Sequence, residues 1–255
     1  MITIALYNLK GGVGKTTTAV NMAYLAAEGK KNTVLWDWDP QGAASWYLGA
    51  DKPETKSIKL VNKGLPIGDF EANSAYPRLT CIPADLSLRH LDAEVADIPK
   101  KSQARKAITK LVEPLSEQTS IVVFDCPPSL SPSVEYLLGG VDLVLVPIIP
   151  SPLSVRAAEQ VVEFFEGKKH APDNIVGFFN MVDARRNLHK ETIIGSKDLS
   201  IDILKTFVPM DAAAESMAER RAPLASYAQN GRAARAYRLL WNEIARTIKA
   251  QRKTK

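Results

Sequence analysis

A glycine-rich loop near the start of the chain carries the residue types that bind phosphate groups. The segment from Lys10 to Thr17 reads Lys-Gly-Gly-Val-Gly-Lys-Thr-Thr. Glycines let backbone N–H groups point into one concavity, and the N-terminus of a following helix adds positive potential there. Lys15 is placed to reach the β- and γ-phosphates of a nucleotide, and the Thr16 hydroxyl is placed to bind Mg²⁺. The residues predicted to contact the nucleotide in this loop are Gly11, Gly12, Val13, Gly14, Lys15, Thr16 and Thr17.

Three carboxylates follow apolar runs elsewhere in the chain. Asp37 and Asp39 end the run that begins at Thr33 and precede a Pro-Gln-Gly turn, and Asp125 ends the run that begins at Ile121. Carboxylates at the carboxyl ends of strands face the crevice where open α/β sheets bind ligands. The place of Asp125 suits an acidic residue that holds Mg²⁺. Solvated turn residues are the alternative for Asp37 and Asp39. Strand alternation puts Trp36 and Trp38 on the opposite face, as packing residues.

Apolar and amphipathic segments alternate along the chain and must position these groups. Such alternation predicts a doubly wound, mostly parallel α/β sheet. The predicted strands span 2–8, 33–37, 79–83, 120–125, 141–147, 174–181 and 203–208. The predicted helices span 15–28, 86–95, 101–116, 131–138, 153–167, 211–219 and 231–250. The stretch 49–78 is the least regular, and its role is not readable.

The loop resembles the deviant Walker A motif of the ParA/MinD group of P-loop ATPases, because Lys10 stands where the first glycine usually lies. The resemblance implies ATP and Mg²⁺ as cofactors and an ATP-sandwich homodimer, in which Lys10 reaches the partner's nucleotide. It also implies that Asp39 orients the attacking water and that Asp37 supports the Mg²⁺ shell. Lys10, Lys15 and Asp39 are therefore the expected catalytic residues, and Thr16, Asp37 and Asp125 the expected metal site.

Later segments extend the resemblance over nearly the whole chain. The stretch 144–153 resembles that of small ParF-like partition ATPases, and 178–185 resembles a ParA segment. Asn180 sits where relatives contact adenine, with a strand-end cap as the alternative. Pro209 and Asp211 lie in a segment like the loop that closes over the base, although the alanine-rich run after Asp211 departs from the usual pattern.

Positive charge gathers at the C-terminal end. The chain has 33 Lys and Arg against 28 Asp and Glu, whereas from Arg220 onward there are ten basic residues and a single acidic one, Glu243. Such clustering is typical of nucleic-acid or anionic membrane binding, and a solvated basic face is the alternative. Arg232 matches the place of a DNA-backbone-binding residue in ParA relatives. The expected DNA contacts are Arg232, Arg235 and Arg238, which could share one exposed helix face, with Arg185, Arg220 and Arg221 on nearby loops.

The remaining features exclude several classes of protein. Cys81 and Cys126 lie far apart in the sequence, which favours a reducing cytoplasm over a disulfide scaffold. No apolar run reaches the ~20 residues that span a bilayer. The first strand starts at once, so we expect neither a signal peptide nor a separate N-terminal helix-turn-helix domain, and residues 1–255 form a single ATPase domain. The three histidines are isolated and show no metal-ligand spacing.

The sequence therefore predicts a cytoplasmic, nucleoid-associated ATPase of the small ParA (ParA/Soj/ParF-like) type. It is expected to dimerise with ATP, bind DNA non-specifically, segregate or position a cargo, and hydrolyse ATP slowly until stimulated by a ParB-like protein or cargo adaptor. A MinD-like regulator on the membrane is the second interpretation, although the polar C-terminal tail argues against stable membrane association. A metal-cluster reductase or carrier of the same fold is the third. The cargo is not readable.

Overall fold

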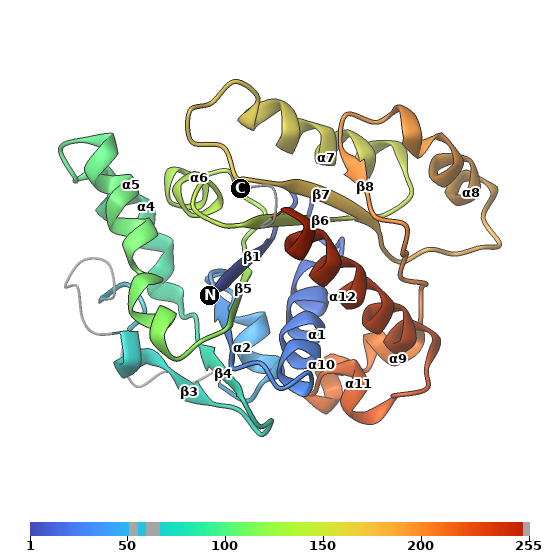
Figure 1. The fold of residues 1–255 in the computed structure, drawn as a ribbon, viewed down its shortest axis with the longest axis horizontal. Helices are drawn as coiled ribbons and strands as arrows, with labels where there is room; N and C mark the ends of the chain where they lie inside the picture. Colours follow the sequence, from blue (N-terminus) through green and yellow to red (C-terminus); the bar gives the residue numbers. More distant parts are fainter. Residues whose placement is uncertain (51–55, 60–66, 252–255) are drawn as a thin grey trace.

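The computed structural model describes residues 1–50, 56–59 and 67–251, which build an eight-stranded sheet (Figure 1). The strand order is β3-β4-β2-β5-β1-β6-β7-β8. All neighbours run parallel except β3 and β4, which pair antiparallel. The strands are β1 Ile2–Leu6, β2 Thr33–Asp37, β3 Ala72–Asn73, β4 Leu79–Ile82, β5 Ile121–Asp125, β6 Leu143–Ile148, β7 Ile175–Phe179 and β8 Asp202–Ile203. The predicted fold class is confirmed.

Helices cover both faces of the sheet (Figure 1). The α-helices are α1 Lys15–Glu28, α2 Ala43–Tyr47, α4 Leu91–Ala96, α5 Lys101–Lys110, α6 Pro132–Leu138, α7 Pro152–Phe165, α8 Asn187–Ile194, α9 Ala212–Glu215, α10 Met217–Arg220, α11 Leu224–Tyr227 and α12 Arg232–Gln251. Short 3₁₀ helices span Ile67–Phe70, Leu86–His90, Glu113–Glu117 and Gly195–Asp198. Helices α1 and α12 pack side by side against one face, and α4 to α7 cover the other.

The central strands are buried on both faces, so alternate side chains enter two different cores. Ile4, Leu35 and Val123 join the core beneath α1 and α12. Trp36 and Phe124 join the other core, where their rings stack at 5.5 Å, and Trp38 meets the Trp36 ring edge-on at 5.4 Å. The prediction that the two tryptophans pack on the face opposite the aspartates is confirmed. This stack ends directly beside the loops that follow β2 and β5.

Three predicted elements differ from the structure. The predicted strand 203–208 is wrong beyond β8, because Lys205 and Thr206 donate their amides to the Glu243 carboxylate of α12 instead of to a strand. The predicted helix 211–219 is divided into α9 and α10, which meet at Ser216. Predicted helix 101–116 stops at Lys110 and continues as a 3₁₀ turn that contains Pro114, whose missing N–H cannot extend an α-helix. Helices α2, α8 and α11 and the short strand β3 were not predicted.

Replacing the stacked tryptophan tests the core that supports the loops. Trp36→Ala is expected to lower the free energy of unfolding by about 3–5 kcal/mol, because it leaves a cavity beside Phe124. Denaturant unfolding measures this loss. Leu239→Ala removes an apolar side chain that is 61% exposed and serves as the control. Equal stability of the two variants would contradict the packing role.

Candidate active site

The glycine-rich loop between β1 and α1 forms an open cradle of backbone amides. Gly12 and Gly14 have φ angles of 72° and 88°, in the left-handed region that favours glycine. A Cβ on Gly14 would lie 2.3 Å from the Nδ2 atom of Asn180. That same Nδ2 donates to the Val13 carbonyl at 2.8 Å, so Asn180 supports the loop from beneath. The loop shape therefore depends on the absence of a side chain at Gly14 and the presence of an amide at position 180.

Asn8 anchors the other end of the loop, and the sequence analysis missed it. Its Oδ1 accepts from the Lys10 amide at 2.9 Å, and its Nδ2 donates to the Pro147 carbonyl at 2.9 Å. The side chain is fully buried. A polar residue directly after an apolar strand and before the glycines is the signal that would have found it. The loop is thus attached to β6 through Asn8 and to the end of β7 through Asn180.

The Lys15 side chain folds back onto the glycine-rich loop. Its side chain donates from Nζ to the Lys10 carbonyl at 3.1 Å, and the residue is 8% exposed. Burial lowers the pKa of Lys15, whereas the negative charge of Asp125 and Asp39 opposes this shift. An anion bound in the cradle would stabilise the charged form of Lys15. Lys10 is half-buried at the rim of the same loop.

Asp37 and Asp125 lie side by side, because β2 and β5 pair in register at these two residues. Asp37 is fully buried and accepts hydrogen bonds from the Ser45 amide at 2.8 Å, the Ser45 hydroxyl at 2.7 Å and the Asp39 amide at 3.2 Å. Burial raises the pKa of Asp37, and the Ser45 bonds oppose the rise. Ser45 is a second site residue that the sequence did not indicate. It comes from α2, which the Pro-Gln-Gly turn positions.

Asp125 is the second buried carboxylate of the site. Neither of its oxygens makes a well-formed hydrogen bond with the described residues. Burial raises the pKa of Asp125 well above its ordinary value, Asp37 and Asp39 raise it further, and the Thr16 hydroxyl and Lys15 lower it. Two adjacent buried carboxylates beside a threonine hydroxyl form the oxygen-rich environment that Mg²⁺ prefers. The residues present therefore fit a magnesium ion at Thr16 and Asp125, with Asp37 behind them.

Asp39 stands one residue beyond the buried pair, in the loop that leads to α2. It is half-exposed, and its Oδ1 accepts from the Gln41 amide at 2.9 Å. The sequence prediction placed it at the point where water meets the nucleotide. Its place between the buried carboxylates and solvent is compatible with that role.

A cavity of about 150 Å³ lies beside the loop and continues the cradle. Asn180, Pro209 and Asp211, the three predicted base contacts, all line it, as do Thr17 and Tyr237. Val182 and Pro209 form an isolated parallel bridge that attaches the covering loop to the end of β7. The structure therefore brings the phosphate-loop residues and the predicted base-contact residues together. Asn180, for example, contacts Val13 although 167 positions separate them in the sequence. The structure also adds Tyr237 of α12, which was not among the predicted base contacts.

The sequence has clear relatives. Residues 1–175 match a family model described as "AAA domain". The "Chromosome-partitioning ATPase Soj" of Treponema pallidum is 30% identical over 253 residues, which cover 95% of this chain and 96% of the relative. The chain belongs to the ParA/MinD-type P-loop ATPases.

Solved structures agree with this ParA/MinD-type fold. The cell division ATPase MinD of Pyrococcus furiosus has a TM-score of 0.79 at 18% identity and covers 96% of this chain and 99% of its own. Cobyrinic acid a,c-diamide synthase of Mycobacterium smegmatis, solved with bound ADP and magnesium, has a TM-score of 0.83 at 21% identity and covers 98% and 96%. At these identities the likeness concerns the fold.

The arginines predicted to bind DNA differ in their surroundings. Arg232 and Arg235 are exposed on α12, whereas Arg238 turns toward α1 and pairs with Glu28. The expectation that all three share one exposed face is therefore wrong for Arg238, because Glu28 at the end of α1 attracts it. Arg221 stacks on the Trp46 ring at 3.8 Å, and Arg220 lies over the Tyr227 ring at 4.8 Å.

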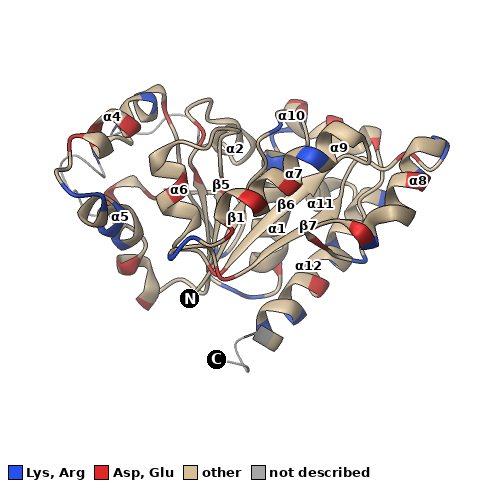
Figure 2. Cartoon of the chain, turned by 90° about the horizontal axis from the view of Figure 1, so that it is seen from above, with Lys and Arg blue, Asp and Glu red and all other residues tan. Residues whose placement is uncertain are grey.

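Arg185 forms a bidentate pair with Asp183 while remaining 89% exposed. Figure 2 shows further Lys and Arg on α5 and α8, away from the C-terminal cluster. Arg252, Lys253 and Lys255 of the predicted basic run lie outside the described residues.

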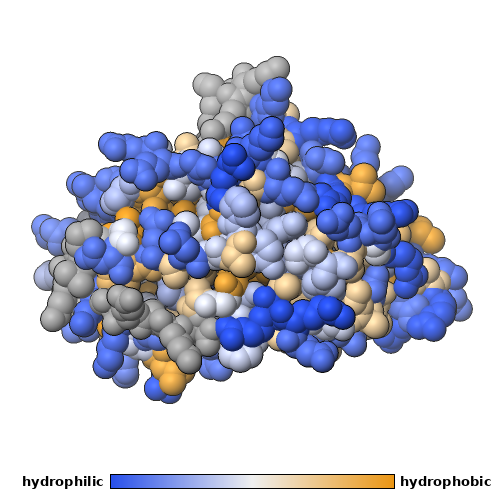
Figure 3. Space-filling view, turned by 90° about the horizontal axis from the view of Figure 1, so that it is seen from below, coloured by the Kyte–Doolittle hydropathy of each residue, from blue (hydrophilic) through white to orange (hydrophobic). Residues whose placement is uncertain are grey.

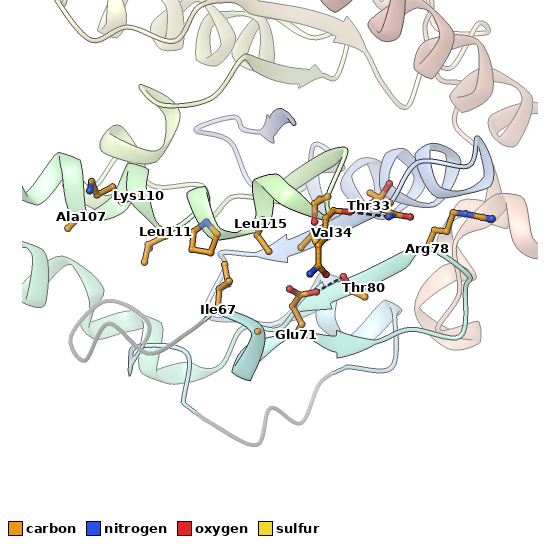
Figure 4. A pocket seen from close by; sticks show the side chains of 15 residues that line it. Thr33, Val34, Ile67, Glu71, Arg78, Thr80, Ala107, Lys110, Leu111 and Leu115 are labelled. Atoms are coloured by element: carbon orange, nitrogen blue, oxygen red, sulfur yellow. Dashed lines mark hydrogen bonds between the residues drawn. The ribbon is translucent and has the colours of Figure 1, made fainter.

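Another cavity, of about 650 Å³, lies at the opposite end of the sheet. Thr33, Arg78 and Thr80 line it at the amino ends of β2 and β4, where Thr80 donates to Glu71 at 3.1 Å (Figure 4). It is therefore remote from the phosphate loop and has no part in the nucleotide site.

The two cysteines are fully buried and belong to different cores, Cys81 beneath α1 and Cys126 on the other face. Within the described residues, no group of three or more His, Cys, Asp or Glu side chains is placed to hold a metal ion. The arrangement gives no support to a metal-cluster carrier.

The buried carboxylate of Asp125 should make the stability of the protein depend on pH. Because the folded-state pKa of Asp125 is raised, the native protein binds a proton more readily than the unfolded chain, and its stability falls as pH rises from about 4 through the raised pKa. Asp125→Asn removes this charge and is expected to raise the Tm of the nucleotide-free protein at about pH 8 by at least about 2 °C. Thermal unfolding at about pH 5 and about pH 8 measures the difference.

Asp202→Asn, which neutralises an exposed carboxylate on β8, is the control and should leave the Tm unchanged. An Asp125→Asn protein that is less stable than the wild type at the higher pH would contradict the assignment.

Proposed function

We propose that this protein is a ParA-type positioning ATPase, built as a single ATPase domain, that binds ATP with Mg²⁺, dimerises around it and hydrolyses it. The observation that carries the proposal is the pair of buried carboxylates Asp37 and Asp125 beside a cradle that holds Lys15. A divalent cation would compensate the negative charge of the two carboxylates, and an anionic nucleotide would compensate the positive charge of Lys15. The relatives named for chromosome partitioning support the biological task.

The residues divide the work of hydrolysis as follows. The amides of Gly11 to Thr17 and the Lys15 ammonium bind the phosphates, and Thr16 and Asp125 hold the magnesium, with Asp37 supporting them. A magnesium ion bound there would supply positive charge to the phosphate oxygens. Asp39 orients the attacking water. Lys10, at the loop rim, serves the nucleotide of the second protomer, so the site is complete only in the homodimer.

DNA binding is proposed for the exposed basic residues, led by Arg232 and Arg235 at the start of α12. Contacts to phosphates carry no base information, so the binding is non-specific. Each protomer alone offers few contacts, whereas a dimer links two such surfaces and raises the effective concentration of the second. ATP thereby controls attachment to the nucleoid, and a ParB-like protein or cargo adaptor that stimulates hydrolysis releases it. The proposed location is the cytoplasm, on the nucleoid.

A MinD-like membrane regulator is the second candidate, and the MinD-like fold favours it. Within the described residues, none of the helices combines the length and the apolar character that a membrane crossing requires. Hydrophilic residues cover most of the face in Figure 3, and the hydrophobic ones are scattered. We favour DNA phosphates as the ligand of the basic side chains of α12, and the experiments below include anionic vesicles as the competing ligand.

Substitutions of Lys10 and Lys15 are expected to affect different steps, dimerisation and nucleotide binding respectively. Lys15→Ala should lose nucleotide binding, because this ammonium lies inside the cradle. Lys10→Ala should bind ATP but remain monomeric. Titration with a fluorescent ATP analogue and sedimentation with ATP separate the two effects, and Lys31→Ala, an exposed lysine, is the control. Normal dimerisation of Lys10→Ala would remove the proposed role in the partner's site.

Asp39→Ala is expected to slow ATP turnover by about 100-fold or more while the nucleotide stays bound, because the water loses its orienting carboxylate. The variant should remain on DNA as an ATP-bound dimer. Turnover and DNA retention are measured on the same sample, with Asp97→Ala as an exposed acidic control. Unchanged turnover would assign the role to another group.

Arg232→Glu is expected to abolish DNA binding while ATP binding and dimerisation persist. For the wild type, affinity should fall with salt at a log–log slope of roughly −0.9 per phosphate neutralised, and unrelated duplexes should bind equally. Lys106→Glu makes the same charge change on α5 and serves as the matched control. Wild-type affinity of the Arg232→Glu dimer, or binding to anionic vesicles and not to DNA, would favour the membrane candidate.

A further inference from the structure

Helix α12 is shared by two surfaces that the proposed function keeps apart. Its buried side supplies Tyr237 to the cavity beside the phosphate loop. Its exposed side carries Arg232 and Arg235 in the first turn. A helix that has one side at the cavity and the other in solvent can transmit a change in position from the cavity to the exposed arginines, or in the reverse direction.

Asp211 joins the cavity to the beginning of this helix. Its Oδ1 accepts from the Ala213 amide at 3.0 Å and caps α9, and its Oδ2 accepts from the Ala233 amide at 3.2 Å. The Ala233 amide belongs to the first turn of α12, where N–H groups have no partner within the helix. One carboxylate that lines the cavity therefore caps two helices, and the second helix bears the exposed arginines.

A second contact joins α12 to the helix that follows the phosphate loop. The Tyr237 hydroxyl lies 3.4 Å from the Thr18 hydroxyl, and both side chains are buried. Thr18 follows Thr17, which lines the cavity. Groups on both sides of the nucleoside cavity thus contact the first two turns of α12.

We propose that Asp211 is a positioning residue that couples occupancy of the nucleoside cavity to the first turn of α12. The inference rests on the proposed function, in which the cavity takes the base of ATP. A base in the cavity restrains the Pro209–Asp211 loop, the carboxylate restrains the Ala233 amide, and the adjacent Arg232 and Arg235 are held in one arrangement. The nucleotide then acts on DNA affinity within a single protomer, in addition to its effect through dimerisation.

Asp211→Asn separates the two bonds, because the two backbone N–H groups bind different carboxylate oxygens and an amide replaces one of these oxygens with an NH₂ donor. Asp211→Ser, whose short side chain suits capping of α9 alone, provides a second variant should the first fold poorly. Glu243→Gln is the matched control. Glu243 also lies on α12 and accepts from two backbone amides, those of Lys205 and Thr206, but it does not line the cavity.

The test compares hydrogen exchange at residues 232–236 with and without a non-hydrolysable ATP analogue and Mg²⁺, at concentrations shown by titration to saturate each protein. Affinity for a duplex of random sequence is measured in the same conditions. In the wild type and in Glu243→Gln, the analogue should slow exchange in the first turn of α12 and tighten DNA binding. In the Asp211 variants, the slowing of exchange should shrink by about fivefold or more, and the gain in DNA affinity should fall to the part that dimerisation supplies.

Full effects in both Asp211 variants would overturn the coupling, and so would a wild type that binds the analogue without any change in exchange at 232–236. A wild type that does not bind the analogue would instead overturn the proposed function itself. Slowed exchange without DNA binding would support the coupling and remove only the DNA part of the proposed function.

Discussion

The architecture of the site depends on two carboxylates placed side by side in the interior of a parallel sheet. Asp37 and Asp125 are brought into register by the pairing of β2 with β5. Burying one unpaired charge is costly, and burying two in contact is more so, because each carboxylate raises the free energy of the other's charged form. Asp37 accepts hydrogen bonds from Ser45, whereas neither oxygen of Asp125 makes a well-formed hydrogen bond with the described residues. The folded protein thus carries an electrostatic strain that a cation relieves, so ligand binding and stability are linked.

The surrounding elements can be understood as supports for that pair and for the cradle opposite it. The Trp36–Phe124 stack fills the far side of the same two strands. Asn8 and Asn180 fasten the ends of the phosphate loop to β6 and β7. Helix α2 exists at this point because Gly42, with φ 65°, turns the chain after Asp39 and brings Ser45 back beneath Asp37. Supports of this kind limit the reorganisation that a reacting phosphate requires.

Local sequence patterns were sufficient for the central strands, the phosphate loop and the carboxylates, because burial on both faces and a glycine motif leave strong signals. They were insufficient where a distant residue decides the local structure. Residues 204–208 have an apolar, strand-like pattern, but Glu243 binds two of their amides. Arg238 has the spacing of an exposed arginine, yet Glu28 pairs with it. Asn8 and Ser45 act through a few specific hydrogen bonds, which no periodicity in the sequence identifies. Tyr237 has the spacing of a core residue and is buried, and it also lines the cavity beside the phosphate loop.

The close approach of Asn180 to Gly14 restricts how these two positions can vary. Any side chain at position 14 would overlap the amide, whose Nδ2 lies 2.3 Å from where a Cβ would be. Shortening residue 180 would make room but would remove the bond to the Val13 carbonyl that supports the loop. Neither single substitution is expected to be neutral, and the free-energy effects of the two substitutions are not additive, because the residues are in contact. Drift at these positions is therefore epistatic: a lineage can leave this combination only through an intermediate whose loop is either obstructed or unsupported.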